Sequence, residues 1–145
     1  MPVFIPSVGR FAQGMIVEVP LHLDTLPGAP RPGELHRVLA EHYAGEPFVE
    51  VASREEAAEL QKARGSGALG YSSALDPESL NGTNKLRIFV FGNERVSQAR
   101  LLAVLDNLGK GAAGAAVQNL EIMLGLEQAP DAQPGVQRAA ARVIS

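Results

Sequence analysis

The sequence predicts an α+β domain built on a mixed, largely antiparallel sheet with helices packed on one face. The predicted elements follow the order β-α-β-α-loop-β-β-α. Two strands follow each other directly and helices separate the others, which is typical of α+β domains. The last two strands are joined by a turn, so we expect them to pair as an antiparallel hairpin. The chain has 145 residues, which is enough for one domain with a buried core.

The first predicted strand covers residues 13–23, where the side chains alternate in character. One face carries Met15, Val17, Val19, Leu21 and Leu23, and the other carries Ile16, Glu18, Pro20 and His22. Alternation of this length is typical of a half-buried strand. Because proline lacks the N–H that a central strand donates, Pro20 indicates that part of this strand lies at a sheet edge.

Two helices and a short strand are predicted next. A loop rich in proline and glycine (residues 27–33) leads into an amphipathic helix with apolar positions at Leu35, Val38, Leu39 and Tyr43. Residues 47–51 predict a short strand. The run Ser53-Arg54-Glu55-Glu56 is a capping-box pattern, which predicts a short, mostly solvated helix ending near residue 63.

The second half of the chain begins with a loop over residues 65–82, interrupted by one helical turn at residues 76–78. Dense apolar runs at residues 86–91 and 99–105 predict the two strands of the hairpin. A helix is predicted over residues 112–124, closed by Gly125 as a C-cap. We expect the domain to cover residues 1–126 and residues 127–145 to form a flexible or helical tail.

Composition excludes several functional classes. With 13 Lys and Arg against 16 Asp and Glu, the net charge of −3 argues against a primary role in binding nucleic acid. The absence of cysteine excludes disulfides, thiolate metal sites and a thiol nucleophile. Apolar runs are shorter than the roughly 20 residues of a membrane span, and no secretory signal opens the chain. We therefore expect a cytoplasmic protein.

Two stretches match the G-x-G-x-x-G pattern of dinucleotide-binding loops. Residues 65–70 follow a charged helix instead of a strand, so they predict a flexible loop. Residues 109–114 do follow a strand and open a helix, and Lys110 lies among the glycines. They predict either a ligand-facing anion site at the helix start or a glycine-rich start that packs tightly on the sheet.

Several polar residues near this second stretch are candidates for a site. Asp106 and Asn107 stand at the end of a strand, where they either tie down the turn or meet a ligand. Gln118 and Asn119 lie on an otherwise apolar helix and need hydrogen-bond partners. Arg10 lies in a glycine-containing turn, where a guanidinium can meet a phosphate or carboxylate.

The three histidines do not form a metal set. His36 and His42 are six residues apart on one predicted helix and face different sides, whereas a zinc pair favours a spacing of four. His22 faces away from the main apolar face of its strand.

Three stretches, taken in order, form a recognisable pattern: FIPSVGRFAQGM at residues 4–15, NGTN at residues 81–84, and LDNLGKGAAGAAVQNL at residues 105–120, followed by MLGL at residues 123–126. Together they resemble the C-terminal half of the N-acetyl-gamma-glutamyl-phosphate reductases, in the semialdehyde dehydrogenase group. The resemblance covers about residues 3–126 and leaves the tail outside.

The resemblance implies the C-terminal domain of an arginine-biosynthesis enzyme, with a fold like that domain of glyceraldehyde-3-phosphate dehydrogenase-like enzymes. In the family an N-terminal Rossmann domain binds NADP, and the C-terminal domain supplies substrate contacts and most of the dimer interface. A cysteine attacks the acyl phosphate, a histidine acts as acid and base, and hydride from NADPH yields the semialdehyde. Because the chain lacks that cysteine and matches the family only beyond that histidine, we expect it to be inactive alone.

The same resemblance places Asn107, Lys110, Gly111 and Gln118 near the nicotinamide end of the cofactor, NADP, and Arg10 near the acyl-phosphate substrate. It implies no catalytic or metal-binding residue in this chain and no role for the histidines. The expected partners are a second copy, in a dimer or tetramer formed through the sheet face, and the Rossmann domain. No membrane or nucleic-acid partner is expected.

Two alternatives stay open. A related semialdehyde dehydrogenase, or the aminoadipyl-phosphate reductase of lysine synthesis, would use a different side chain near the substrate. A stand-alone binding or assembly module would keep the fold without the chemistry. An upstream reading frame that encodes a G-x-G-x-x-G strand–turn–helix and a cysteine would exclude the module.

Overall fold

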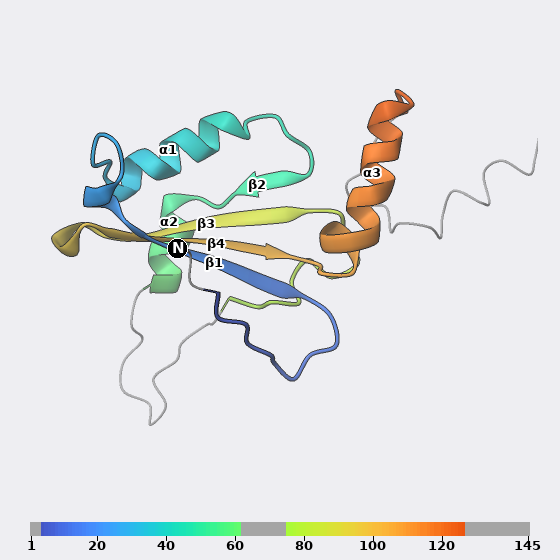
Figure 1. The fold of residues 1–145 in the computed structure, drawn as a ribbon, viewed down its shortest axis with the longest axis horizontal. Coiled ribbons are helices and arrows are strands. Elements are labelled where there is room, and N and C mark those ends of the chain that lie inside the picture. The colour runs from blue at the N-terminus through green and yellow to red at the C-terminus, as the bar shows by residue number, and fades with distance from the viewer. Residues whose placement is uncertain (1–3, 62–74, 127–145) are drawn as a thin grey trace, which may run out of the picture.

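The computed structural model describes residues 4–61 and 75–126 and shows one four-stranded sheet (Figure 1). The strands are β1 (Met15–His22), β2 (Val49–Val51), β3 (Leu86–Asn93) and β4 (Gln98–Leu105). They lie in the order β1-β4-β3-β2. The β1–β4 and β3–β4 pairs are antiparallel and the β2–β3 pair is parallel. The predicted α+β class and the mixed, largely antiparallel sheet are confirmed.

The helices α1 (Pro32–His42) and α2 (Arg54–Gln61) lie on opposite faces of the sheet (Figure 1). A Cβ on Gly92 of β3 would lie 2.3 Å from the Cβ of Pro32, so α1 covers the face to which Gly92 points. Leu60 of α2 packs with Phe89, which points to the other face because side chains alternate along a strand. The prediction that the helices share one face is therefore wrong.

The helices cover both faces of the sheet because of the composition of β3. Its residues are apolar on both faces, with Ile88 and Val90 on the side of α1 and Phe89 and Phe91 on the side of α2. A strand of this kind is stable only when both of its faces are covered. The buried residues Ala52, Phe89, Leu102 and Val104 form the core between the sheet and α2.

Strand β1 lies at the edge of the sheet, as Pro20 indicated. Its alternation is also confirmed, because Val17 pairs with Ala103 and Val19 with Leu101 on one face. This face is nevertheless open: Val17 is 44% exposed and Val19 is 47% exposed. We call the surface formed by Met15, Val17, Val19, Leu101 and Ala103 the open face.

The opposite face of β1 is mixed in character, and its side chains Ile16, Glu18, Pro20 and His22 are all exposed. Glu18 of β1 pairs there with Arg100 of β4.

The predicted hairpin is confirmed in β3 and β4, which are joined by a 3₁₀ turn at Glu94–Val96. The Oδ1 atom of Asn93 accepts a hydrogen bond from the N–H of Arg95 at 3.2 Å and so stabilises the turn. Ser97 closes it with a left-handed backbone, at φ 49°.

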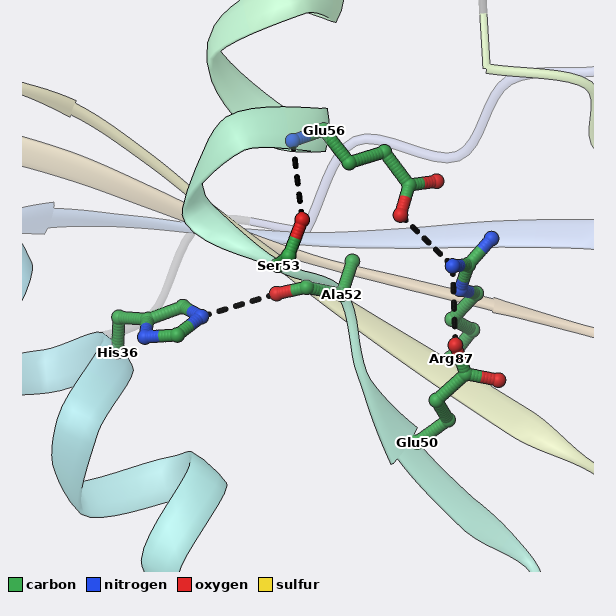
Figure 2. A network of polar contacts seen from close by, with 6 residues as sticks. All are labelled: His36, Glu50, Ala52, Ser53, Glu56 and Arg87. Carbon is green, nitrogen blue, oxygen red and sulfur yellow. Dashed lines mark hydrogen bonds and ion pairs between the residues drawn. The ribbon is translucent and has the colours of Figure 1, made fainter.

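The start of α2 shows one half of the predicted capping box. The Oγ atom of Ser53 accepts a hydrogen bond from the N–H of Glu56 at 3.1 Å. The carboxylate of Glu56 instead contacts Arg87 at 2.7 Å, and Glu50 contacts the same guanidinium at 2.9 Å (Figure 2). On the other side, the Nε2 atom of His36 lies 2.9 Å from the carbonyl oxygen of Ala52, which links α1 to the end of β2.

The last described helix, α3 (Gly114–Met123), is preceded by a π-helical turn at Gly109–Ala113, so helical structure begins earlier than predicted. Its end matches the prediction. Gly125 has a left-handed backbone, at φ 63°. The N–H of Gly125 donates to the carbonyl oxygen of Ile122, and the N–H of Leu126 donates to the carbonyl oxygen of Glu121. These two bonds form a Schellman motif, for which glycine is favoured at this position.

The predictions for the glycine-rich residues 65–70 and for the tail at residues 127–145 lie outside the described residues. Within the described ranges, no helix is long and apolar enough to cross a membrane.

Candidate functional site

Three segments that are far apart in the sequence meet at one end of the sheet. The strand register places Met15 beside Leu105, and Leu105 beside Leu86. The residues just before β1, just before β3 and just after β4 are therefore neighbours. We call this group, which consists of Gln13, Gly14, Gly82, Asn84, Asp106 and Asn107, the strand-end cluster.

The carboxylate of Asp106 is the centre of this cluster and is only 1% exposed. Its Oδ2 atom accepts hydrogen bonds from the side chain of Gln13 at 2.5 Å and the N–H of Gly82 at 2.8 Å. Its Oδ1 atom accepts from the N–H groups of Leu108 at 2.8 Å and Gly109 at 2.9 Å. One side chain thus connects all three segments.

Two opposing effects act on the pKa of Asp106. Burial raises the pKa, but the hydrogen bonds from Gly109, Gly82, Leu108 and Gln13 to the ionised carboxylate outweigh it. The net result is a pKa below the usual value for aspartate, so the group is ionised at neutral pH.

Asn107 binds the segment before β1 through a hydrogen bond. Its Oδ1 atom accepts a hydrogen bond from the N–H of Gly14 at 2.8 Å. Gly14 has a left-handed backbone at φ 109°, and a Cβ there would lie 2.3 Å from the carbonyl oxygen of Pro77. Glycine is needed at this position for both reasons.

The glycine-rich stretch after β4 packs closely against the cluster. A Cβ on Gly109 would lie 2.9 Å from the Oδ2 atom of Asp106, and one on Gly114 would lie 2.6 Å from the Oδ1 atom of Asn84. The N–H of Gly111 donates to the carbonyl of Asp106 at 2.8 Å, five residues back, which is the bond of a π-helical turn. Of the two roles predicted for this stretch, tight packing accounts for Gly109 and Gly114.

Lys110 and Gln118 meet on the outer side of the π-helical turn. The Nζ atom of Lys110 donates to the Oε1 atom of Gln118 at 2.7 Å and lies 5.2 Å from the centre of the Phe48 ring. The Nδ2 atom of Asn84 donates to the same Oε1 atom at 3.1 Å. Burial lowers the pKa of Lys110 below the usual value for lysine.

The structure therefore brings only some of the predicted site residues together. Lys110 and Gln118 are in direct contact, and Gly111 is exposed in the turn beside Lys110. Asn107 contacts a different segment, at Gly14. Arg10 is exposed in the segment before β1.

Four residues of the cluster received no role from the sequence: Gln13, Gly14, Gly82 and Asn84. All four lie in motifs that carried the family resemblance, and Asn84 is a polar side chain two residues before an apolar strand. Polar side chains that are buried need partners, and this is the signal that points to Asn84, which is 5% exposed.

A hollow of about 470 Å³ lies over the cluster and is lined by Gln13, Asn81, Gly82, Asp106, Leu108, Gly109 and Ala113. Within residues 4–61 and 75–126, no three His, Asp or Glu side chains gather where they could hold a metal ion. The polar groups of this region are the hydrogen-bonding side chains of the cluster, the carboxylate of Asp106 and, in the π-helical turn, the ammonium of Lys110.

Comparison with known proteins extends this picture. The sequence model of a family described as semialdehyde dehydrogenase, dimerisation domain, matches residues 1–107. The match ends before Lys110, Gly111 and Gln118.

Among curated proteins, the N-acetyl-gamma-glutamyl-phosphate reductases of Brucella ovis, Brucella canis and Brucella suis are each 52% identical over 124 residues. The aligned region is 86% of this chain but 36% of each relative. The chain therefore spans little more than a third of the length of these relatives.

Proposed function

The chain belongs to the semialdehyde dehydrogenase dimerisation-domain family, and from this premise we propose that it is the substrate-binding and dimerisation domain of an acyl-phosphate reductase. The reductase would use NADP to convert N-acetyl-gamma-glutamyl phosphate to N-acetylglutamate semialdehyde, in the arginine biosynthesis of the cytoplasm. The observation that carries the proposal is the 52% identity to enzymes of that name.

The roles in this proposal are divided between the chain and the rest of the enzyme. Reduction of an acyl phosphate through a covalent intermediate needs a nucleophile, and a chain without cysteine lacks the thiol that the family uses. The chain would instead bind and orient the reactants. Arg10 would contact the acyl phosphate, since a guanidinium is suited to bidentate contact with phosphate.

Asn107, Lys110, Gly111 and Gln118 would form the part of the cofactor site that this chain contributes. When bound, NADPH supplies the hydride for the reduction. The donors fit this ligand, since Lys110 and the amide of Gln118 can bind oxygen acceptors such as a carboxamide or a phosphate. Asn107 would act through its amide N–H groups, because its Oδ1 atom is bound to Gly14.

Two surfaces are suited to the proposed partners. The open face would form the interface with a second copy, since a sheet face with exposed valines is apolar enough to pack in a dimer. The helix α3 extends beyond the sheet (Figure 1), and Leu120, Ile122 and Met123 are exposed on it. We propose that α3 packs on the dinucleotide-binding domain of the longer enzyme.

A hybrid enzyme tests the function. The matching stretch of the Brucella ovis reductase is replaced by this chain, and NADPH oxidation is followed with the acyl phosphate. We expect turnover by the hybrid and none by the chain alone. Arg10→Ala should raise the KM for the acyl phosphate about tenfold, from the loss of a charged hydrogen bond.

The matched control is Arg37→Ala, which removes an exposed arginine paired with Glu41 on α1 and should leave KM unchanged. Turnover by the chain alone would contradict the division of roles. A hybrid that folds and dimerises but does not oxidise NADPH would contradict the proposed function.

A further inference from the structure

Asn81 and Gly82 form the one Asn-Gly pair in the sequence. In an unfolded chain, asparagine deamidates most readily in this pair, because glycine has no side chain that hinders the attack of its own nitrogen on the asparagine amide. Each of the other asparagines precedes a residue with a large side chain: Asn84, Asn93, Asn107 and Asn119. Asn81 is therefore the asparagine that we expect to react first once the chain is unfolded.

The reaction joins two atoms of the pair and consumes water. The nitrogen of Gly82 gives its proton to water and attacks the Cγ atom of Asn81. A new C–N bond forms, the C–N bond of the side-chain amide breaks, and the amide nitrogen leaves as ammonia. Water then opens the cyclic succinimide and yields aspartate or isoaspartate. During the attack negative charge develops on the Oδ1 atom of Asn81, so a donor at this oxygen would accelerate the reaction.

In the folded chain, both reacting groups are hydrogen-bonded to the strand-end cluster. The N–H of Gly82 donates to the Oδ2 atom of Asp106 at 2.8 Å, so loss of this proton would place negative charge next to a carboxylate. The Nδ2 atom of Asn81 donates to the carbonyl oxygen of Gln13 at 3.1 Å and so restricts the amide. The attack is therefore unfavourable while the cluster is closed.

The Oδ1 atom of Asn81 also lacks the donor that would stabilise the attack. This atom is buried, and no donor among the described residues binds it. A Cβ on Gly14 would lie 3.1 Å from this oxygen, so the backbone of Gly14 packs against it. Negative charge that develops on a buried oxygen without a donor is costly.

Each member of the pair has a structural role in the fold. Gly82 has a left-handed backbone at φ 76°, a conformation that favours glycine. Asn81 connects the segment before β3 to the segment before β1 through Gln13. Both residues are half-buried and line the hollow of about 470 Å³ over the cluster, through which water can reach them.

We propose that Asn81–Gly82 is a deamidation site that reacts only when the strand-end cluster opens locally, and that the product weakens the cluster. The product carboxylate accepts hydrogen bonds but does not donate, so the bond to the carbonyl of Gln13 is lost. A second carboxylate also joins Asp106 at the same hollow. The inference concerns the chemical lifetime of this chain and does not depend on the proposed reductase function.

The first test compares deamidation with hydrogen exchange in the same chain, at one pH and temperature. Peptide mapping by mass spectrometry measures deamidation at Asn81 in the folded chain and in guanidinium chloride, and NMR measures exchange of the Gly82 N–H. Both reactions require this N–H to leave Asp106, so folding should slow deamidation by at least the factor by which it slows exchange. Deamidation that is slowed less than exchange would overturn the proposal.

Asn119 provides an internal control, because it is exposed on α3 and precedes Leu120. In the unfolded chain, Asn81 should react faster than Asn119. In the folded chain, this advantage should be lost. An advantage of the same size in both states would show that the fold does not protect Asn81 and would contradict the proposal.

The role of Asp106 is tested by Asp106→Ala, which removes the acceptor for the N–H of Gly82. Deamidation of Asn81 in the folded chain should become about tenfold faster or more, because opening of the cluster then costs less free energy. The control Asp24→Ala removes an exposed carboxylate outside the cluster and should have no effect. Equal rates in the two variants would contradict the role of Asp106. If Asp106→Ala does not fold, the comparison with hydrogen exchange decides the proposal.

The effect of the product is tested by Asn81→Asp, which is one of the two reaction products. Exchange of the Gly82 N–H should become about tenfold faster or more in this variant, because the bond to Gln13 is lost. Asn119→Asp adds the same charge at an exposed position of α3 and should leave this exchange unchanged. Unchanged exchange in Asn81→Asp would show that the product does not weaken the cluster.

Discussion

At the scale of single residues, Asp106 contributes most to the candidate site, because its carboxylate accepts four hydrogen bonds from three segments. Asp106→Asn would replace one oxygen by an N–H₂ group that faces backbone donors. We expect the variant to lose about 2–3 kcal/mol of stability in urea unfolding, the cost of charged hydrogen bonds lost in a buried site.

The same substitution should also change the dependence of stability on pH. The folded pKa of Asp106 lies below the unfolded value of about 4, so the unfolded chain binds more protons between the two values and stability rises with pH there. The contribution is complete above the unfolded pKa and is lost as the pH falls through the folded pKa. In Asp106→Asn this acid-sensitive contribution should disappear, whereas the exposed control Asp24→Asn should keep it. An unchanged acid profile in Asp106→Asn would contradict the assignment.

At the scale of elements, the π-helical turn and α3 depend on close packing at Gly114. Its backbone is ordinary α-helix, at φ −61°, so only space limits a side chain there. Gly114→Ala would place a Cβ 2.6 Å from Asn84 and 2.7 Å from the carbonyl oxygen of Gly109. We expect a loss of about 1–3 kcal/mol from overpacking, measured by thermal unfolding.

The matched control is Gly111→Ala in the same turn. Its Cβ would meet its nearest neighbour, the carbonyl oxygen of Asp106, at 3.3 Å. The change should therefore stay within about 1 kcal/mol of the wild type, because alanine also lowers the entropy of the unfolded chain. Equal stability of the two variants would show that packing at Asn84 does not determine this helix start.

At the scale of the whole molecule, the proposed dimer interface is the open face. Val17 points out of an edge strand whose apolar side no described helix covers. Val17→Asp should shift self-association toward the monomer by about tenfold or more in Kd, because a dimer would bury an unpaired charge. Light scattering at high micromolar concentration measures the change.

Val38→Asp is the control for this prediction, since Val38 is an equally apolar residue that is 54% exposed on α1. It adds the same charge away from the open face and should leave association unchanged. A wild-type chain that is monomeric at these concentrations would contradict the use of the open face by the isolated chain.

Much of the fold could be predicted from local sequence patterns. The alternation over β1, the edge position of Pro20, the hairpin and the cap at Gly125 all depend on interactions between near neighbours or on the chemistry of a single residue. Local patterns did not predict which face of the sheet each helix covers. The apolar residues on both sides of β3 were nevertheless a signal that both faces are covered. The capping box was half right because Glu56 pairs with Arg87, 31 residues away.

The sequence by itself determined the order of the elements, the motifs shared with the reductases and, through the absence of cysteine, the lack of a thiol nucleophile. Only the tertiary structure decided which faces are covered and which polar side chains meet. Gln13 and Asp106 are 93 positions apart, yet their side chains are in contact. The reason is that the start of β1, the start of β3 and the end of β4 lie side by side in the sheet. Such contacts depend on packing across the sheet, and no pattern of near neighbours encodes them.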